Sequence, residues 1–600
     1  MKTSLKIVAP LILLIFMTGC TPKKDITAKD ILGNPDYLAM SFGGYKHKTR
    51  DSVPSVDEIK DDLKISAVLG IKLIRTYNTQ HYDQAANLLK AIRQLKEEDS
   101  NFEMYVMLGA WIECKDAWKA SKDHTSGNVE NNIAEIEMAV AMANEYPDIV
   151  KMIAVGNESM IQWATGYFVY PNIILKWVNH LQDLKKSGGL PKDVWITSSD
   201  NYEAWGGGSE IYQTEDLTAL LKAVDFVSLH TYPFHSTFYD ITFWGTPSEE
   251  ENLSDKEKIG AAMVRAKNYA IAQYQSTADY ITSLGIKKPI HIGETGWATN
   301  ASRLYGATGS HAADEYKEKV FYQDMRKWTN NAGISCFYFK VFDENWKDDR
   351  DELGSENHFG FIKLNGQAKY VLWNLVDKGV FDGLTRDGVK ITKTYNGDEA
   401  LLMKDVLTPP TLKEIGILET STVNDTRKVG ETVTEGTYVI INESLVPNTT
   451  NNMTYPSAKL KLNAIDGTCN MKMIENSIIE IRTGTGDWWV CNLQLETGED
   501  LSKFEKGQLH FEIKGNTNSS FKVGFQTGYY TQGTQVDNYV TFGPKETYSI
   551  TEKWTKHTIS MAELNKNADL TAVTGIIYCK GVSNFDGKNL SIKNMYYTQE

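Results

Sequence analysis

The sequence lacks an excess of basic residues. It has 63 lysines and arginines against 77 aspartates and glutamates, which gives a net charge of -14. This balance argues against nucleic acid, or an anionic membrane surface, as the main partner and suits a neutral substrate better. A chain of 600 residues with 41% hydrophobic and 23% charged residues is expected to be globular and to form two or three domains.

The sequence also lacks an apolar run long enough to span a bilayer. After a basic start, the apolar stretch Ile7 to Met17 is followed by Thr18-Gly19-Cys20 and then by polar residues. This is the pattern of an export signal rather than of a membrane-spanning helix. The end of residues 1–20 resembles a bacterial lipobox, which implies that Cys20 carries the lipid anchor of an exported, outer-membrane lipoprotein. An ordinary signal peptide with an incidental cysteine is the alternative, and the membrane face stays open.

Cysteines are few. Besides Cys20 the chain has five, and an odd number in an exported protein cannot all pair. Cys469 and Cys491 could form one bridge, although the sequence does not require it. None of the cysteines has the close spacing of a zinc site. His230 and His291 have no third ligand at a suitable spacing, so we expect histidines that support the site or the core, and no metal or cofactor.

Between residues 36 and 378, short β-rich runs alternate with longer segments whose apolar residues recur every three to four positions. This alternation predicts an α/β fold, a (β/α)₈ TIM barrel over residues 30–380. The eight predicted strands are Tyr37–Gly44, Lys72–Asn78, Phe102–Trp111, Val150–Asn157, Val194–Asn201, Val224–Tyr232, Pro289–Gly296 and Gly333–Phe342. The predicted helices are Asp57–Leu69, Gln84–Lys96, Asn131–Asn144, Asn172–Lys186, Glu215–Ala223, Lys258–Leu284 and Ala312–Asn330.

The pattern changes in the last third of the chain. Residues 381–456 are polar and interrupted by Gly, Asn and Pro, and we interpret them as a connecting region. Alternating short apolar runs over residues 457–600 predict a C-terminal all-β sandwich domain. Trp488 and Trp489 are adjacent in one of these runs, so they should point to opposite faces of a strand.

Two glutamates end predicted barrel strands. Glu158 follows Ile153-Ala-Val-Gly-Asn157 on the fourth strand, and Glu294 lies in Ile290-His-Ile-Gly-Glu-Thr-Gly-Trp297 on the seventh. Barrel enzymes place their chemistry at this end of the strands. A pair of carboxyl groups can break a glycosidic bond, because one protonates the leaving oxygen while the other attacks the sugar or activates water. A pair of structural ion pairs at the rim is the alternative.

The motifs around these glutamates resemble glycoside hydrolase family 17, the β-1,3-glucanase family. Gly293-Glu-Thr-Gly-Trp297 closely resembles its nucleophile signature, and Val155-Gly-Asn-Glu158 resembles its acid/base motif. The similarity extends over residues 37–376. Ala298 stands where the family usually has proline, so substrate preference follows from the resemblance less firmly than mechanism does. Three further matching segments are Ile74-Arg-Thr-Tyr77, Thr231-Tyr-Pro-Phe234 and Phe342-Asp-Glu-Asn-Trp-Lys347.

The resemblance implies a role for each matched residue. Glu158 would be the acid/base and Glu294 the nucleophile, with carboxyl groups about 5 Å apart as in retaining enzymes. Asn157 would donate to the sugar 2-hydroxyl. The other residues expected to bind substrate are Tyr77, Tyr232, Trp297, Glu344 and Lys347.

Some of these residues have a simpler interpretation. Tyr77, Tyr232, Trp111 and Trp297 could pack in the barrel, although aromatic rings also stack on sugar rings. We favour the two tyrosines as cleft residues, and the sequence does not decide Trp111. Glu344 and Lys347 could form a surface ion pair. In the last domain, Gly486-Asp-Trp488-Trp489, Gly524 to Gly528 and Trp554 resemble parts of carbohydrate-binding modules, but a structural spacer is as good an interpretation.

The sequence thus predicts a retaining endo-β-1,3-glucanase that acts on β-glucan polysaccharide or oligosaccharide as a monomer, touching the membrane only through its lipid. A β-1,3-glucanosyltransferase or an exo-acting β-glucanase would use the same carboxylates, and the loops around the cleft decide between them. A glycan-binding lipoprotein without catalysis is the alternative from a different class, but a binder has no need for two facing carboxylates.

Overall fold

The computed structural model describes residues 25–411 and two later stretches. Within 25–411 the residues left out are 81, 120, 302–303 and 349–352. The later stretches are 437–441 and 460–599, the second with gaps at 465–467, 475–477, 484–487, 516–518, 529–534, 544–545, 565–567 and 582–588. The predicted signal peptide and Cys20 lie outside the described residues. In the part of the chain that is described, no helix combines the length and the apolar character that crossing a membrane requires.

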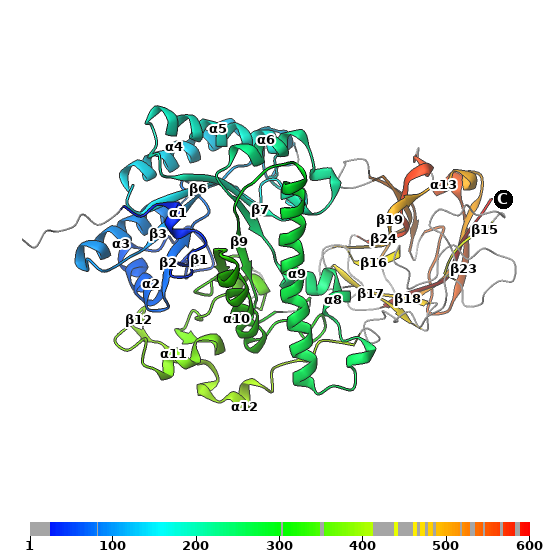
Figure 1. The fold of residues 1–600 in the computed structure, drawn as a ribbon. Coiled ribbons are helices and arrows are strands. Elements are labelled where there is room, and N and C mark those ends of the chain that lie inside the picture. The colour runs from blue at the N-terminus through cyan, green and yellow to red at the C-terminus, as the bar shows by residue number, and fades with distance from the viewer. Residues whose placement is uncertain are drawn as a thin grey trace, which may run out of the picture.

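Eight strands close into a barrel in which every neighbouring pair is parallel. All eight predicted strands are present, and the TIM-barrel prediction is confirmed (Figure 1). In order around the barrel they are β1 (Leu38–Ser41), β2 (Ile71–Arg75), β3 (Tyr105–Ala110), β6 (Val150–Asn157), β7 (Trp195–Asn201), β8 (Val227–His230), β9 (Ile290–Gly296) and β10 (Cys336–Phe339).

Helices between the strands surround the barrel, as the apolar spacing predicts (Figure 1). Their ends follow local chemistry. For example, the Ser55 side chain and Glu58 cap each other at the start of α2, and left-handed Gly188 and Gly333 end α5 and α10. The principal helices are α2 (Val56–Val68), α3 (Gln84–Glu98), α4 (Val129–Glu145), α5 (Pro171–Ser187), α6 (Glu215–Ala223), α7 (Pro233–Tyr239), α8 (Ile241–Trp244), α9 (Asp255–Ser283) and α10 (Glu315–Ala332).

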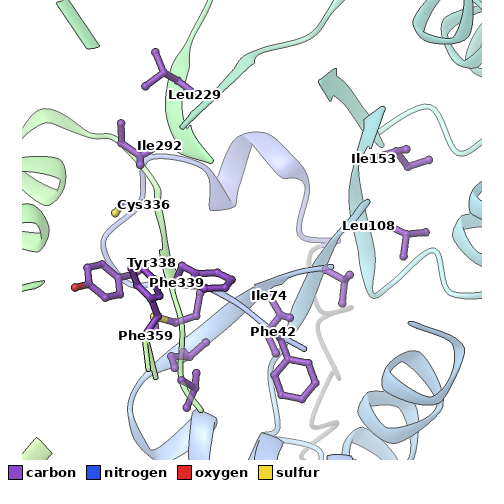
Figure 2. Packing of buried hydrophobic residues seen from close by; sticks show 14 of the residues in the cluster. Phe42, Ile74, Leu108, Ile153, Leu229, Ile292, Cys336, Tyr338, Phe339 and Phe359 are labelled. Carbon is purple, nitrogen blue, oxygen red and sulfur yellow. The ribbon is translucent and has the colours of Figure 1, made fainter. Parts of the chain in front are cut away.

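Alternation along the strands separates two buried layers. Leu73 belongs to a small cluster with residues of the short helix α1 (Ala28–Ile31), whereas its neighbour Ile74 belongs to the large cluster that includes the helices. Successive strand residues therefore face the barrel interior and the helices in turn. Side chains of the large cluster on five strands are seen in Figure 2, namely Ile74, Leu108, Ile153, Leu229 and Ile292.

The first residues of the predicted connecting region contact the barrel. Residues 381–411 pack on the barrel, because fully buried Arg386 forms an ion pair with buried Asp62 of α2, with 2.9 Å between Arg386 Nε and Asp62 Oδ1. Thr394 Oγ1 donates to Glu315 of α10 at 2.6 Å. The elements of this segment are β12 (Thr385–Arg386), β13 (Val389–Lys390), β14 (Thr392–Lys393) and α12 (Glu399–Leu402), and they follow β11 (Gln367–Ala368) and α11 (Trp373–Asp377).

The C-terminal part forms two antiparallel sheets around one apolar core, which confirms the all-β prediction. One sheet contains β17 (Cys469–Ile474), β18 (Ile478–Thr483), β25 (Asn589–Thr598), β20 (Gln508–Gly515) and β23 (Thr555–Ser560), and β15 (Thr437–Ile441) pairs with β25. The other contains β16 (Leu460–Ala464), β19 (Trp489–Glu499), β24 (Val573–Gly581), β21 (Phe521–Thr527) and β22 (Val536–Phe542). Because β15 belongs to this domain, the domain begins before the predicted residue 457.

The two adjacent tryptophans and two of the cysteines in the sandwich can be compared with what the sequence predicts. Trp489 is fully buried in the core, whereas Trp488 is 42% exposed, so the prediction of opposite faces is confirmed. Cys469 and Cys491 are both buried and are not joined by a disulfide. The bridge that the sequence left open is therefore absent between them.

Candidate active site

Glu294 lies on β9 at the carboxyl end of the barrel and is almost fully buried. Its two carboxylate oxygens have different donors. Tyr232 Oη donates to Oε1 at 2.6 Å, and Tyr77 Oη donates to Oε2 at 2.9 Å. Arg75 Nη1 forms an ion pair with Oε2 and also donates to the Gly293 carbonyl at 3.2 Å. Three side chains therefore fix the orientation of this carboxylate.

The charges around Glu294 keep it ionised. Burial by itself would raise the pKa of this carboxyl group, but electrostatic interactions with Arg75 first, and then with His230 and Lys347, act in the opposite direction. Together with the hydrogen bond from Tyr232 they lower the pKa of Glu294 to about 2. Glu294 is thus a negatively charged, oriented carboxylate at neutral pH.

Glu158 directly follows β6 and has a left-handed backbone conformation, with φ of 46°. Its N–H donates to the Ser199 carbonyl of β7 at 2.9 Å. His230 of β8 is fully buried, with its Nδ1 3.0 Å from Glu158 Oε1 and its Nε2 2.7 Å from Ser199 Oγ. Oε2 of Glu158 has no hydrogen-bond partner among the described residues, and the side chain is 19% exposed. One oxygen is held and the other is available to a ligand.

Arg75 joins the two carboxylate-bearing segments. Its Nη1 contacts Glu294, and its Nη2 donates to Oδ1 of Asn157, the residue before Glu158. Sequence reasoning missed this arginine, although it lies within the Ile74-Arg-Thr-Tyr77 match. A signal was present, because residues two apart on a strand share a face, so Arg75 accompanies Tyr77.

The two predicted cleft tyrosines meet at Glu294. Burial and then the negative charge of Glu294 raise the pKa values of the Tyr77 and Tyr232 hydroxyls well above the usual value, so both stay protonated and act as donors. The Arg75 guanidinium carbon also lies 4.7 Å from the centroid of the Tyr77 ring. The oxygen of Asn157 is occupied by Arg75, which leaves its amide NH₂ as the group that can donate to a ligand.

Glu344 and Lys347 do not form the ion pair considered from the sequence. Glu344 is buried and accepts from Lys340 Nζ at 2.5 Å and from the Tyr45 N–H at 3.1 Å. Lys347 pairs instead with Glu356, with 3.3 Å between Nζ and Oε2. The positive charge of Lys347 acts on Glu294, which places the lysine near the carboxylate. Sugar binding by Glu344 and Lys347 stays a prediction.

The structure does not place Trp297 in a cleft, so that prediction is corrected. Trp297 is fully buried, donates from Nε1 to the Ala312 carbonyl at 2.8 Å, and packs against Phe234 and Phe321. It follows β9 immediately and therefore supports the strand that carries Glu294. Trp111 is half-buried and its ring contacts Tyr167, with 4.8 Å between centroids.

The histidines support the fold, as expected. His230 orients Glu158, and His291 lies elsewhere in the barrel, where Nδ1 accepts from the Ser335 N–H at 3.1 Å. Burial lowers the pKa of His291 to about 4, so it is neutral at physiological pH. Within the described residues, no three His, Cys, Asp or Glu side chains are grouped so as to hold a metal ion.

Comparison with known proteins agrees with this geometry. Residues 39–360 match the BtgE/BtgC glycoside hydrolase domain, and residues 429–599 match carbohydrate binding domain 30. The chain is similar to the crystal structure of an endo-laminarinase from Formosa Hel1_33_131, with 57% identity and a TM-score of 0.64; the match covers 66% of this chain and all of that one.

Two curated relatives are more distant. A glucan 1,3-beta-glucosidase of Arthroderma benhamiae is 26% identical over 305 residues, which cover 50% of this chain and 78% of that protein. A glucan 1,3-beta-glucosidase of Schizosaccharomyces pombe is 22% identical over 302 residues, which cover 50% and 76%. The family 17 resemblance inferred from the motifs is confirmed. The chain therefore belongs to the BtgE/BtgC glycoside hydrolase family and carries a C-terminal carbohydrate-binding module.

Proposed function

We propose that this protein is a retaining endo-β-1,3-glucanase that hydrolyses β-1,3-linked glucan through Glu294 and Glu158. The observation that carries the proposal is the contrast between the two carboxyl groups. Glu294 is buried, oriented by Arg75, Tyr77 and Tyr232, and ionised because its pKa is lowered to about 2. Glu158 is held through one oxygen only. Such a division suits one nucleophile and one acid/base.

In the first step, an oxygen of Glu294 attacks the anomeric carbon of the bound sugar and forms a covalent glycosyl ester. The glycosidic C–O bond breaks, and its oxygen receives the proton of Glu158, most directly from Oε2, which has no partner in the described structure. The leaving chain departs as an alcohol. The tyrosine hydroxyls and Arg75 keep Glu294 aligned for the attack.

In the second step, Glu158 takes a proton from water, and the water oxygen attacks the same anomeric carbon. The ester bond to Glu294 breaks, and the carboxylate is regenerated. Two inversions at one carbon retain its configuration. His230 keeps Glu158 in place through both steps, because its other ring nitrogen is bound to Ser199.

The sequence identities favour endo cleavage over the related activities. The Formosa protein, named an endo-laminarinase, is 57% identical, whereas the two glucan 1,3-beta-glucosidases are 26% and 22% identical. The C-terminal module would hold the same polysaccharide near the barrel. A long, soluble or insoluble glucan is therefore the expected substrate.

The proposal includes the location of the enzyme. The signal-like residues 1–20 and Cys20 support a lipid-anchored, exported monomer on the outer membrane, where the anchor would keep the enzyme beside the polysaccharide. Labelling with a radioactive or azide-bearing fatty acid tests this. We expect label in the native chain and none in Cys20→Ser, and equal labelling of both would contradict the anchor.

The catalytic assignment is tested with Glu294→Gln, which keeps the size of the side chain but removes the nucleophile. Glu137→Gln, an exposed residue of α4, is the matched control. We expect Glu294→Gln to abolish hydrolysis of laminarin-like β-1,3-glucan while glucan binding persists, and the control to match the native enzyme. Ordinary turnover by Glu294→Gln would refute the assignment.

The linkage and the stereochemistry are tested by product analysis. The native enzyme is offered β-1,3, mixed-linkage and β-1,4 glucans, and proton NMR follows the first product. We expect internal cleavage of β-1,3-glucan with a β-anomer formed first. Cleavage of β-1,4-glucan alone would contradict the proposed substrate, and an α-anomer formed first would contradict the double displacement.

A further inference from the structure

Three aromatic side chains form a continuous row at the carboxyl end of β3 and β6. Tyr167 lies in the middle, with its ring centroid 4.8 Å from that of Trp111 and 5.1 Å from that of Trp118. Trp118 is the exposed end of this aromatic row, since 68% of its surface is accessible. Unlike a singly exposed tryptophan, Trp118 is continuous with two further rings, so the three side chains present one aromatic surface.

The backbone holds Trp118 in this place. A small hairpin, β4 (Cys114–Lys115) and β5 (Asp123–Gly127), follows β3. The Cys114 N–H donates to the Tyr167 carbonyl at 2.9 Å, and the Trp118 N–H donates to the Gly166 carbonyl at 2.8 Å. Trp118 also has a φ of 67°, a conformation that bulky residues rarely adopt. The hairpin thus presents the Trp118 ring to the loop that follows Glu158.

Close packing at Gly166 completes the placement. A Cβ atom on Gly166 would lie 2.6 Å from Cζ3 of Trp118, so the ring lies directly against the glycine backbone. At the other end of the row, the Trp111 N–H donates to Glu135 at 3.2 Å, and its Nε1 lies 3.4 Å from a Glu113 oxygen. These contacts place the three rings within the loops that follow β3 and β6.

The row is on the Glu158 side of the site. Tyr167 belongs to the same β6–α5 loop as Glu158, and the pKa of its hydroxyl is raised well above the usual value, first by burial and then by the negative charge of Glu158; Glu294 has a smaller effect. The Tyr167 hydroxyl has no hydrogen bond to any described residue. A ring beside the acid, with a free hydroxyl, can contact the sugar whose oxygen the acid protonates.

We propose that the aromatic row of Trp111, Tyr167 and Trp118 binds the glucose units on the leaving-group side of the cleaved bond. This inference rests on the proposed function and adds to it. Each ring is about as wide as a pyranose ring and can stack on its C–H face, so the row offers contacts to more than one unit. It accepts the reducing-end part of the β-1,3-glucan before cleavage.

The same row has a second consequence. While the sugar is bound to Glu294 as an ester, a β-1,3-oligosaccharide on the row can present a hydroxyl in place of water. The hydroxyl oxygen attacks the anomeric carbon, its proton passes to Glu158, and the ester bond to Glu294 breaks. The row therefore raises the fraction of glycosyl transfer at high oligosaccharide concentration.

The test compares Trp118→Ala with Trp118→Phe, and uses Trp163→Ala as the matched control. Trp163 is in the same loop as Tyr167 and is 57% exposed. Laminarihexaose carrying ¹⁸O at its reducing end reveals which bond is cleaved. The leaving group of an aryl β-laminaribioside is a single ring. Its cleavage rate therefore measures the chemical step without a contact between the leaving group and Trp118, the exposed end of the row.

We expect Trp118→Ala to lower kcat/KM on laminarihexaose about tenfold, the size of one aromatic contact, and to move cleavage toward the reducing end. Activity on the aryl substrate should change less than about twofold on the same basis, and transfer products should decrease. Trp118→Phe and Trp163→Ala should resemble the native enzyme. Gly166→Ala, whose Cβ would displace the Trp118 ring, should reproduce the changed cleavage pattern.

An unchanged cleavage pattern in Trp118→Ala, or an equal change in Trp163→Ala, would overturn the inference and leave the proposed function intact. Inactivity of the native chain on every β-1,3 substrate would instead contradict the proposed function. In that case calorimetric titration with laminarihexaose still tests the row. Weaker binding by Trp118→Ala would support it, and equal binding would overturn it.

Discussion

Arg75 offers a sharp test of the electrostatics, because it is buried and contacts Glu294, Asn157 and the Gly293 carbonyl. Arg75→Met keeps most of the side-chain length and removes the charge and every hydrogen bond. Arg75 is the largest of the influences that lower the pKa of Glu294, so its removal should raise that pKa. The nucleophile should then be protonated over part of the pH range in which the native enzyme works.

The magnitude follows from the lowered pKa. A shift of the Glu294 pKa from its ordinary 4.5 to about 2 corresponds to about 3 kcal/mol, at about 1.4 kcal/mol per pH unit. Because the folded-state pKa is lowered, this stabilisation is present above pH 4.5 and is lost as pH falls from 4.5 through 2. Arg75 is the largest of the influences that lower this pKa, so at pH 7 Arg75→Met should reduce the free energy of unfolding by up to about 3 kcal/mol, while Tyr77 and Tyr232 still donate to Glu294.

Two measurements check this. The acidic limb of kcat/KM against pH should move to higher pH in Arg75→Met, and denaturant unfolding should show a deficit at pH 7 that narrows as pH falls below 4.5. The double variant Arg75→Met/Glu294→Gln should recover much of the lost stability, because the buried charge is gone as well. Arg93→Met, which removes a 39% exposed side chain on α3, is the control. An unmoved acidic limb together with unchanged stability would refute the reasoning.

Two further predictions concern stability. Arg386→Met removes the ion-pair partner of buried Asp62, so the free energy of unfolding in denaturant should fall by about 3–5 kcal/mol at pH 7. If it fell no more than in an exposed control such as Arg93→Met, the pair would not anchor residues 381–411. Glu318 is buried, and neither of its oxygens has a hydrogen-bond partner among the described residues. Burial raises the pKa of Glu318 well above 4.5, so native stability should fall as pH rises above 4.5, and Glu318→Gln should weaken that fall. If the free energy of unfolding changed by the same amount between pH 5 and pH 8 in the native protein and in Glu318→Gln, the second prediction would be contradicted.

The barrel could be predicted from the sequence because its signals are local. The apolar strand runs and the amphipathic helices recur along the chain, and the predicted Val150–Asn157 and Glu215–Ala223 agree with β6 and α6 at both ends. The prediction of the sandwich was less complete. β15 and β16 are short strands in polar surroundings, so their alternating apolar pattern is weak. Their membership depends on pairing with strands far along the chain.

Sequence alone determined where the two carboxylates would lie, because Glu158 and Glu294 terminate strands whose parallel order brings their carboxyl ends to one rim. Only the tertiary structure decided which groups surround them. Arg75 meets Glu294 across 219 positions of sequence; the strand pattern places Arg75 on the face of Tyr77 but does not encode which distant residue it contacts. The same holds for Trp297, whose neighbours in space bury it fully, and for the aromatic row, where a hairpin after one strand meets the loop after the next. These arrangements depend on packing between distant segments, and packing is a property of the folded chain.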